Sequence, residues 1–75
     1  MEIKLQGIYA PLKAIYAKNL KIGDITVWNY GYKEKVLDIT FTKSNKSVRV
    51  KILSIESGKE FTRTLRINRL IAIEI

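Results

Sequence analysis

Five consecutive residues, Trp28-Asn29-Tyr30-Gly31-Tyr32, contain three of the seven aromatic side chains of this 75-residue chain, including its one tryptophan. Exposed tryptophan and tyrosine rings stack on nucleic-acid bases or anchor protein interfaces. The preceding residues 24–27 have the composition of a strand. If Ile25 and Val27 face the core, alternation places Trp28 and Tyr30 on the outer face. We therefore predict a binding surface at Trp28, Tyr30 and Tyr32.

Four basic residues follow on one predicted hairpin with no acidic residue between them: Lys43, Lys46, Arg49 and Lys51. Arg49 and Lys51 share strand parity, so they project from the same face about 6–7 Å apart. This spacing is close to that of successive phosphates, which makes a track for a nucleic-acid backbone plausible. The alternative is that the lysines only keep a sheet edge soluble.

Arg63, Arg66 and Arg69 are spaced by three residues, which alternates faces on a strand. Arg63 shares parity with apolar neighbours, so we predict a structural ion pair, because an unpaired buried charge is costly. Its candidate partners are Asp24, Asp38 and Glu60. Arg66 projects outward and is the better candidate for binding a ligand.

The composition excludes several kinds of chemistry. The chain has no cysteine and no histidine, so common zinc sites and histidine-dependent catalysis are ruled out. Ser57-Gly58-Lys59 brings a hydroxyl and an amine together, but in a hairpin turn without an activating helix. The seven acidic residues are dispersed. We expect no enzyme, no catalytic residue, no metal site and no cofactor.

The net charge is +7, and such a field favours anionic partners. Nucleic acid, an acidic protein surface and anionic lipid all fit this charge, and a basic, soluble surface without a specific ligand is the plainer alternative. No apolar run approaches the roughly 18 residues of a membrane span, and residues 1–12 lack the pattern of a signal peptide. We expect no membrane partner and a cytoplasmic location in the producing or infected cell.

The pattern of apolar residues predicts a mainly β chain in two parts. Residues 1–19 should form a short strand and a short helix, over residues 11–19, that pack on the body or on a partner. Residues 20–75 should form a small five-stranded antiparallel barrel, with a bulge near residues 52–54. Its strands are predicted at residues 24–30, 34–42, 47–55, 60–66 and 71–75. In this arrangement Trp28 could also plug the barrel end or lie under the helix.

The opening Leu20-Lys21-Ile22-Gly23-Asp24, followed by ITVWN, resembles the first strand of SH3-like barrels, including KOW-type modules. The tight turn expected at Asn68-Arg69-Leu70 is similar to the helical turn before their last strand. This resemblance covers residues 20–75 and implies a fold, not a function. The segments WNYGY, ESGKE and NRLIAI also resemble parts of short bacteriophage and mobile-element proteins.

Three hypotheses follow from the sequence. The first is a non-enzymatic module that binds nucleic acid through Trp28, Tyr30 and Tyr32 together with the Lys and Arg side chains. The second is a protein-interaction module that uses the aromatic side chains as anchors and its charge to steer toward an acidic partner. The bacteriophage resemblance implies that such a module inhibits a host factor, such as a nucleic-acid-handling or defence complex. The third is a homodimer paired through residues 3–5 or 71–75.

Overall fold

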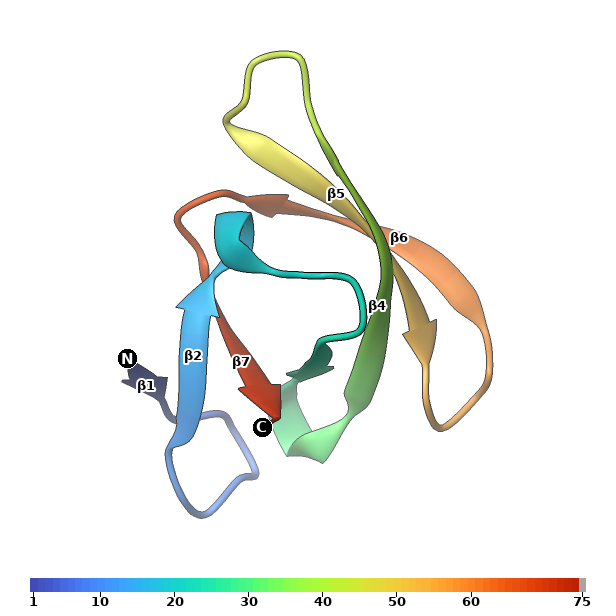
Figure 1. The fold of residues 1–75 in the computed structure, drawn as a ribbon. Helices are drawn as coiled ribbons and strands as arrows, with labels where there is room; N and C mark the ends of the chain where they lie inside the picture. The colour runs from blue at the N-terminus through green and yellow to red at the C-terminus, as the bar shows by residue number, and fades with distance from the viewer. Residues whose placement is uncertain (75) are drawn as a thin grey trace.

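The computed structural model describes residues 1–74, which form an antiparallel sheet of seven strands with two short 3-10 turns and no α-helix (Figure 1). The order across the sheet is β1-β2-β7-β3-β4-β5-β6. The 3-10 turns are η1 (Ala17–Asn19) and η2 (Asn29–Gly31). The strands are β1 (Glu2–Ile3), β2 (Leu12–Tyr16), β3 (Ile25–Val27), β4 (Lys33–Phe41), β5 (Ser47–Ser54), β6 (Glu60–Arg66) and β7 (Leu70–Glu74).

The prediction of a mainly β, antiparallel chain is confirmed, and β4 to β7 begin and end within one residue of their predicted positions. Ile75, the last residue of the predicted final strand, lies outside the described residues. The first body strand is shorter than predicted because η2 interrupts it. Tyr30 adopts φ 65° there, a left-handed conformation that no strand can continue.

The helix predicted over residues 11–19 is wrong. Residues 12–16 form β2, which pairs with β7 in the register Ala14↔Ala72, and only the last three residues turn helically, as η1. Leu12, Ile15 and Tyr16 fit one face of a helix, but so short a run fits a strand equally well. The edge of β7 offers backbone hydrogen bonds to a strand, and this tertiary contact decides the outcome.

The predicted number of five strands is also wrong, because β1 and β2 extend the sheet beyond β7. The sheet does not close through backbone pairing: β1 and β6 lie at its two edges. β7 lies between β2 and β3, so a dimer through residues 71–75 would have to displace one of these neighbours. β1 has an unpaired edge among residues 1–74.

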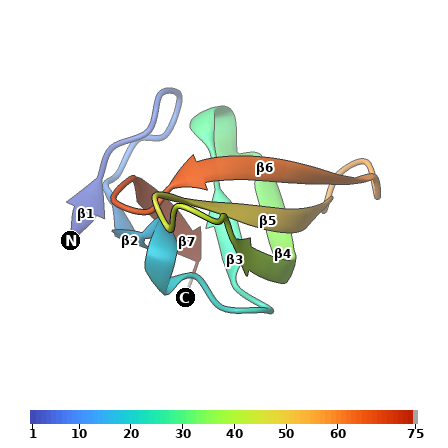
Figure 2. The same cartoon turned by 90° about the horizontal axis from the view of Figure 1, so that it is seen from above.

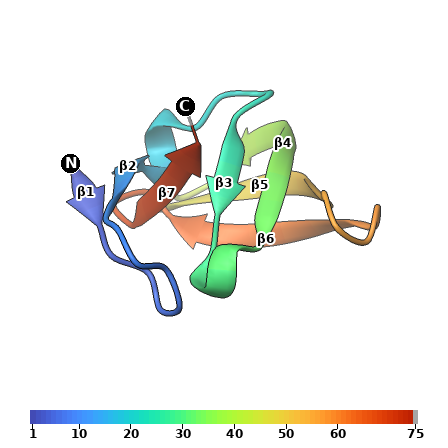
Figure 3. The same ribbon diagram turned by 90° about the horizontal axis from the view of Figure 1, so that it is seen from below.

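The sheet is strongly coiled, so that β5 and β6 run across the direction of β3 and β4 (Figures 2 and 3). Its inner face holds the core, which is built from Ala17, Leu20, Val36, Val48, Val50, Ile52, Leu65 and Ile71. A register shift on β4 between Val36 and Asp38 accommodates the bend. The bulge therefore lies on β4, and the prediction of a bulge near residues 52–54 of the facing strand β5 is wrong.

Candidate nucleic-acid interface

The outer face of β5 carries two cations. Val48, Val50 and Ile52 are buried on the inner face, and the intervening Arg49 and Lys51 are exposed. This is the alternation expected of a strand with one covered face. The two cations therefore project into solvent from the same side of the sheet, as the sequence predicted.

The register of β5 with β6 adds a third cation to this side. Arg49 lies opposite Thr64, and Ser47 lies opposite Arg66. Arg66 is therefore a diagonal neighbour of Arg49, at a Cα spacing of about 7–8 Å. We call the exposed side formed by Arg49, Lys51 and Arg66 the basic face.

Two carboxylates lie beside one end of the basic face. Asp38 is opposite Lys51 in the register of β4 with β5, and Glu60 Oε1 lies 3.4 Å from Lys51 Nζ. Arg49 instead lies between two threonines, Thr40 and Thr64. Among residues 1–74, neither Arg49 nor Arg66 forms an ion pair. The charge free to bind an anion is therefore concentrated on these two arginines.

Lys43 and Lys46 lie on the turn between β4 and β5, which projects beyond the rest of the sheet in Figure 1. Both side chains are exposed. The Lys46 carbonyl accepts a hydrogen bond of 3.2 Å from the backbone N–H of Ile67, which follows β6 directly. Lys46 is thus next to Arg66 and extends the basic face, whereas Lys43 lies further out on the turn.

Trp28 is not part of the basic face. Its side chain is only partly exposed and packs against the core. Its indole Nε1–H donates a 3.0 Å hydrogen bond to Thr26 Oγ1, and the guanidinium carbon of Arg63 lies 4.2 Å from the ring centroid. Arg69 lies over the same ring at 5.5 Å. Two arginines cover Trp28, and the predicted helix does not. The position of Trp28 therefore resembles the alternative in which this side chain has a structural role and does not bind a ligand.

Arg63 forms an ion pair, but none of the three predicted carboxylates is its partner. Its Nε and Nη2 donate hydrogen bonds of 2.8 and 2.9 Å to the two carboxylate oxygens of Glu34. Glu34 is 5% exposed because it shares the inward parity of Val36. The alternation in the sequence also indicates this parity, but Glu34 lies at the predicted start of its strand and is not among the predicted partners.

The ion pair between Arg63 and Glu34 also indicates how strongly the sheet is curved. Glu34 lies opposite Ser54, and Arg63 lies opposite Val50, four residues earlier on β5 and on its other side. On a flat sheet their backbones would be about 16 Å apart. The bidentate contact requires β4 and β6 to curl toward each other over the inner face.

Tyr30 and Tyr32 lie at the end of β4 remote from Arg49. They are 63% and 54% exposed. Thr40, which is opposite Arg49, follows Tyr32 by eight residues, a separation of roughly 25 Å along a strand. The structure therefore does not bring these tyrosines together with the basic face. They form a separate exposed end of the molecule.

The N-terminal loop holds Tyr30 in place. The backbone N–H of Tyr30 donates a 2.7 Å hydrogen bond to the Gln6 carbonyl, and the Gln6 N–H donates to Asn29 Oδ1 at 3.0 Å. Gly7 packs so closely that a Cβ there would lie 2.4 Å from Tyr30 Cδ1. The neighbouring Tyr9 is 99% exposed, and the sequence does not single it out because it lies outside the aromatic run.

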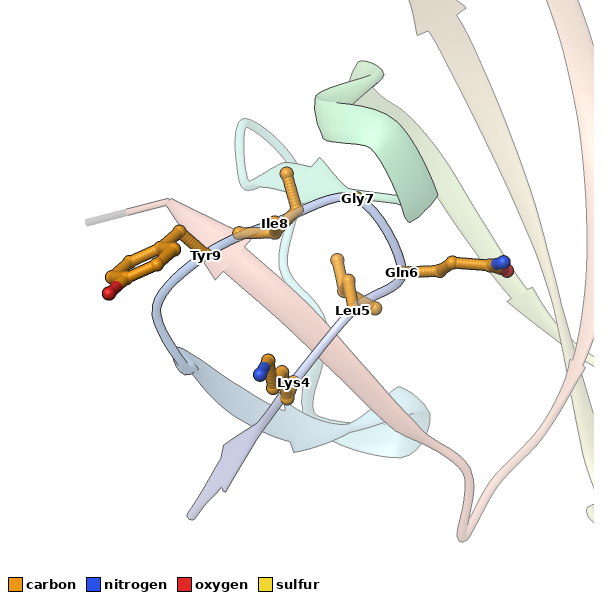
Figure 4. Close-up of a pocket in the computed structure, with 6 residues that line it drawn as sticks. All are labelled: Lys4, Leu5, Gln6, Gly7, Ile8 and Tyr9. Carbon is orange, nitrogen blue, oxygen red and sulfur yellow. The ribbon is translucent and has the colours of Figure 1, made fainter.

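A hollow within the N-terminal loop is lined by residues 4–9 (Figure 4). Leu5 projects toward the inside of the loop, whereas Gln6 and Tyr9 point away from it. Lys4 is the one titratable side chain in the lining besides Tyr9. The lining contains no carboxylate. We call the exposed Tyr30 and Tyr32 the tyrosine end.

Residues 1–74 contain no group of three or more side chains placed to hold a metal ion. No helix in this part of the chain has the length and apolar character needed to cross a membrane. In the comparisons with known proteins, no family model, curated protein or solved structure matches this chain.

Proposed function

We propose that this chain is a non-catalytic module that binds nucleic acid, with the phosphate backbone lying along the basic face. The observation that carries the proposal is the pair of exposed arginines, Arg49 and Arg66, which are diagonal neighbours without an acidic partner in the described chain. Guanidinium groups match phosphate oxygens in geometry and charge. Threonine hydroxyls on the same face add neutral donors.

The strand order supports the proposal of an SH3-like barrel for the body of the chain. β7-β3-β4-β5-β6 is a run of antiparallel neighbours, and a short turn at residues 67–69 connects the two ends of that run. The contacts of Arg63 with Trp28 and Glu34 link β6 to the strands on the other side of the inner face. In this view side chains, in place of a backbone ladder, close the barrel.

The net charge of +7 supports the same function, because it raises the rate at which an anionic polymer is encountered. We propose that the module acts in the cytoplasm of the producing or infected cell, where RNA and, in bacteria, DNA are accessible to it. The tyrosine end is too far from Arg49 to stack on the nucleotide that Arg49 contacts. The tyrosine end can contribute to nucleic-acid binding only when the bound nucleic-acid strand extends over several nucleotides.

Binding can be tested by fluorescence anisotropy with labelled 12-nucleotide single-stranded DNA, single-stranded RNA and duplex DNA over a series of salt concentrations. With three phosphate contacts on a single strand, the logarithm of the association constant should fall with a slope of about −2 against the logarithm of salt concentration. Absence of binding to all three polymers at low salt would reject the proposal.

A second candidate function is a protein-interaction module that inhibits a host factor, and the tyrosine end favours it. Tyr30 is held at φ 65°, and non-glycine residues in this conformation cluster at functional sites. Tyrosines held rigidly in advance are effective interface anchors, because little entropy is lost on binding. This partner would contact Tyr30 and Tyr32 instead of the basic face.

Pull-down from a nuclease-treated host lysate separates the two candidates. If the second is correct, a stoichiometric protein is retained by the wild type and by Arg49→Gln/Arg66→Gln, but not by Tyr30→Ser/Tyr32→Ser. If instead the basic-face variant loses the protein and the tyrosine variant keeps it, the tyrosine end is not the interface.

A further inference from the structure

The turn between β6 and β7 carries Arg69, a cation outside the basic face, beside Arg66 and Lys46. One hollow of about 440 Å³ there is lined by Thr64, Arg66, Asn68 and Arg69. An adjoining hollow is lined by Lys46, Arg66, Ile67 and Asn68. The two hollows adjoin at Arg66 and Asn68, which line both of them, and we refer to the pair as the turn recess.

The turn recess contains three cations and no acid. None of Lys46, Arg66 and Arg69 takes part in the ion pairs of residues 1–74. The side chains of Thr64 and Asn68 can both donate hydrogen bonds. Every polar side chain of the lining thus offers a donor to an anion, and the three cations repel one another until an anion is present.

Trp28 holds Arg69 at the recess without neutralising it. The Arg69 guanidinium carbon lies 5.5 Å from the centroid of the indole ring, within the range of a cation–π contact. The ring itself is fixed by its hydrogen bond to Thr26 and by Arg63. The two arginines on this ring differ in one respect: Glu34 neutralises Arg63, whereas Arg69 has no carboxylate partner within residues 1–74.

We infer that the turn recess binds a phosphate group of nucleic acid, with Arg66 and Arg69 as the principal ligands and Trp28 as the positioning residue for Arg69. Asn68, Thr64 and Lys46 complete the set of donors. The inference rests on the proposed function and deepens it. Arg66 belongs to both the basic face and the turn recess. A nucleic-acid strand that lies along the basic face would therefore continue past β6 into the turn recess.

The recess can be tested directly with inorganic phosphate and the ¹⁵N-labelled full chain. In NMR spectra at constant ionic strength, the Nε–H signals of Arg66 and Arg69 and the Asn68 side-chain amide should shift saturably as phosphate replaces chloride. The same titration of Arg69→Gln should lose this response. Equal, non-saturating shifts at Arg49, Arg66 and Arg69 would mean that phosphate only screens the surface, and would overturn the inference.

The role of Trp28 needs a readout that a loss of folding does not mimic. Trp28→Phe keeps an aromatic ring under Arg69, and Trp28→Leu removes it. Both variants are first checked for native amide spectra. We expect phosphate affinity to fall about 2–5-fold in Trp28→Phe and to reach the level of Arg69→Gln in Trp28→Leu. Unchanged affinity in a folded Trp28→Leu would contradict the positioning role.

Binding of a 12-nucleotide single strand separates this inference from the proposed function. Arg69→Gln and Asn68→Ala should each weaken it, with Arg69→Gln lowering the salt slope by about 0.7. Arg69→Lys should restore the slope but not the full affinity, because the planar fork is lost. If Arg69→Gln changes nothing while Arg49→Gln weakens binding, the recess is wrong and the proposed function stands. If neither weakens it, both are wrong.

Discussion

The guanidinium of Arg63 lies 4.2 Å from the centroid of the Trp28 ring and at the same time donates two hydrogen bonds to Glu34. The side chain therefore joins β6 to β4 and to the residue that follows β3. β3 and β4 are paired with each other at Thr26 and Glu34, but β6 is paired with neither of them. Side chains of three elements thus hold together the part of the sheet that backbone hydrogen bonds leave open.

Replacing Glu34 by Gln should destabilise the protein. The substitution leaves the Arg63 charge partly buried without its carboxylate, and breaking such pairs costs several kcal/mol when they are fully buried. Because the Arg63 side chain is 34% exposed, we expect a smaller loss of about 2 kcal/mol in urea unfolding. Glu60→Gln is the matched control. It breaks the exposed pair with Lys51 and should change stability by less than about 0.5 kcal/mol.

Replacing Gly7 by Ala tests the contact that holds the tyrosine end. Gly7 has φ 77°, and the added Cβ would lie 2.4 Å from Tyr30 Cδ1. Gly58→Ala is the control, because Gly58 has φ 71° with open space around it. We expect a loss of about 1 kcal/mol for Gly58→Ala and at least twice that for Gly7→Ala. Equal losses in thermal unfolding would mean that the contact with Tyr30 contributes nothing.

Removing residues 1–19 should prevent stable folding of the remainder, although the sequence suggests a self-contained body over residues 20–75. The deletion exposes the edge of β7 and removes Ala14 and Ala17, which are 2% and 0% exposed. Deletion of residues 1–3 alone removes only the edge strand β1 and should be tolerated. Circular dichroism with thermal melting distinguishes these outcomes. A cooperative transition of residues 20–75 at the wild-type temperature would show that β2 is dispensable.

The long body strands were predictable because their signal is local. β4, β5 and β6 each alternate apolar and polar residues and are separated by polar turns, and period-2 alternation with one covered face determines both strand type and outer face. For this reason the positions of Arg49, Lys51 and Arg66 on one side of the sheet could be anticipated from the sequence.

The remaining features depend on contacts that alternation does not encode. β2 is a strand because β7 offers it an edge, and Trp28 is covered because Arg63 and Arg69 reach it from β6 and the following turn. The separation of the tyrosine end from Arg49 follows from the length of β4. The sequence shows that both groups exist but not that they lie at opposite ends of a strand.

The salt dependence of single-strand binding by two triple variants tests the central claim most directly. Arg49→Gln/Lys51→Gln/Arg66→Gln removes the basic face, and Lys13→Gln/Lys21→Gln/Lys59→Gln removes three exposed lysines elsewhere, so each lowers the net charge by three from +7 to +4. We predict that the first loses affinity on the order of 100-fold at 0.1 M salt and about 2 units of slope, and that the second stays within about threefold of the wild type. Equal losses in both variants would contradict the claim, because net charge alone would then account for binding.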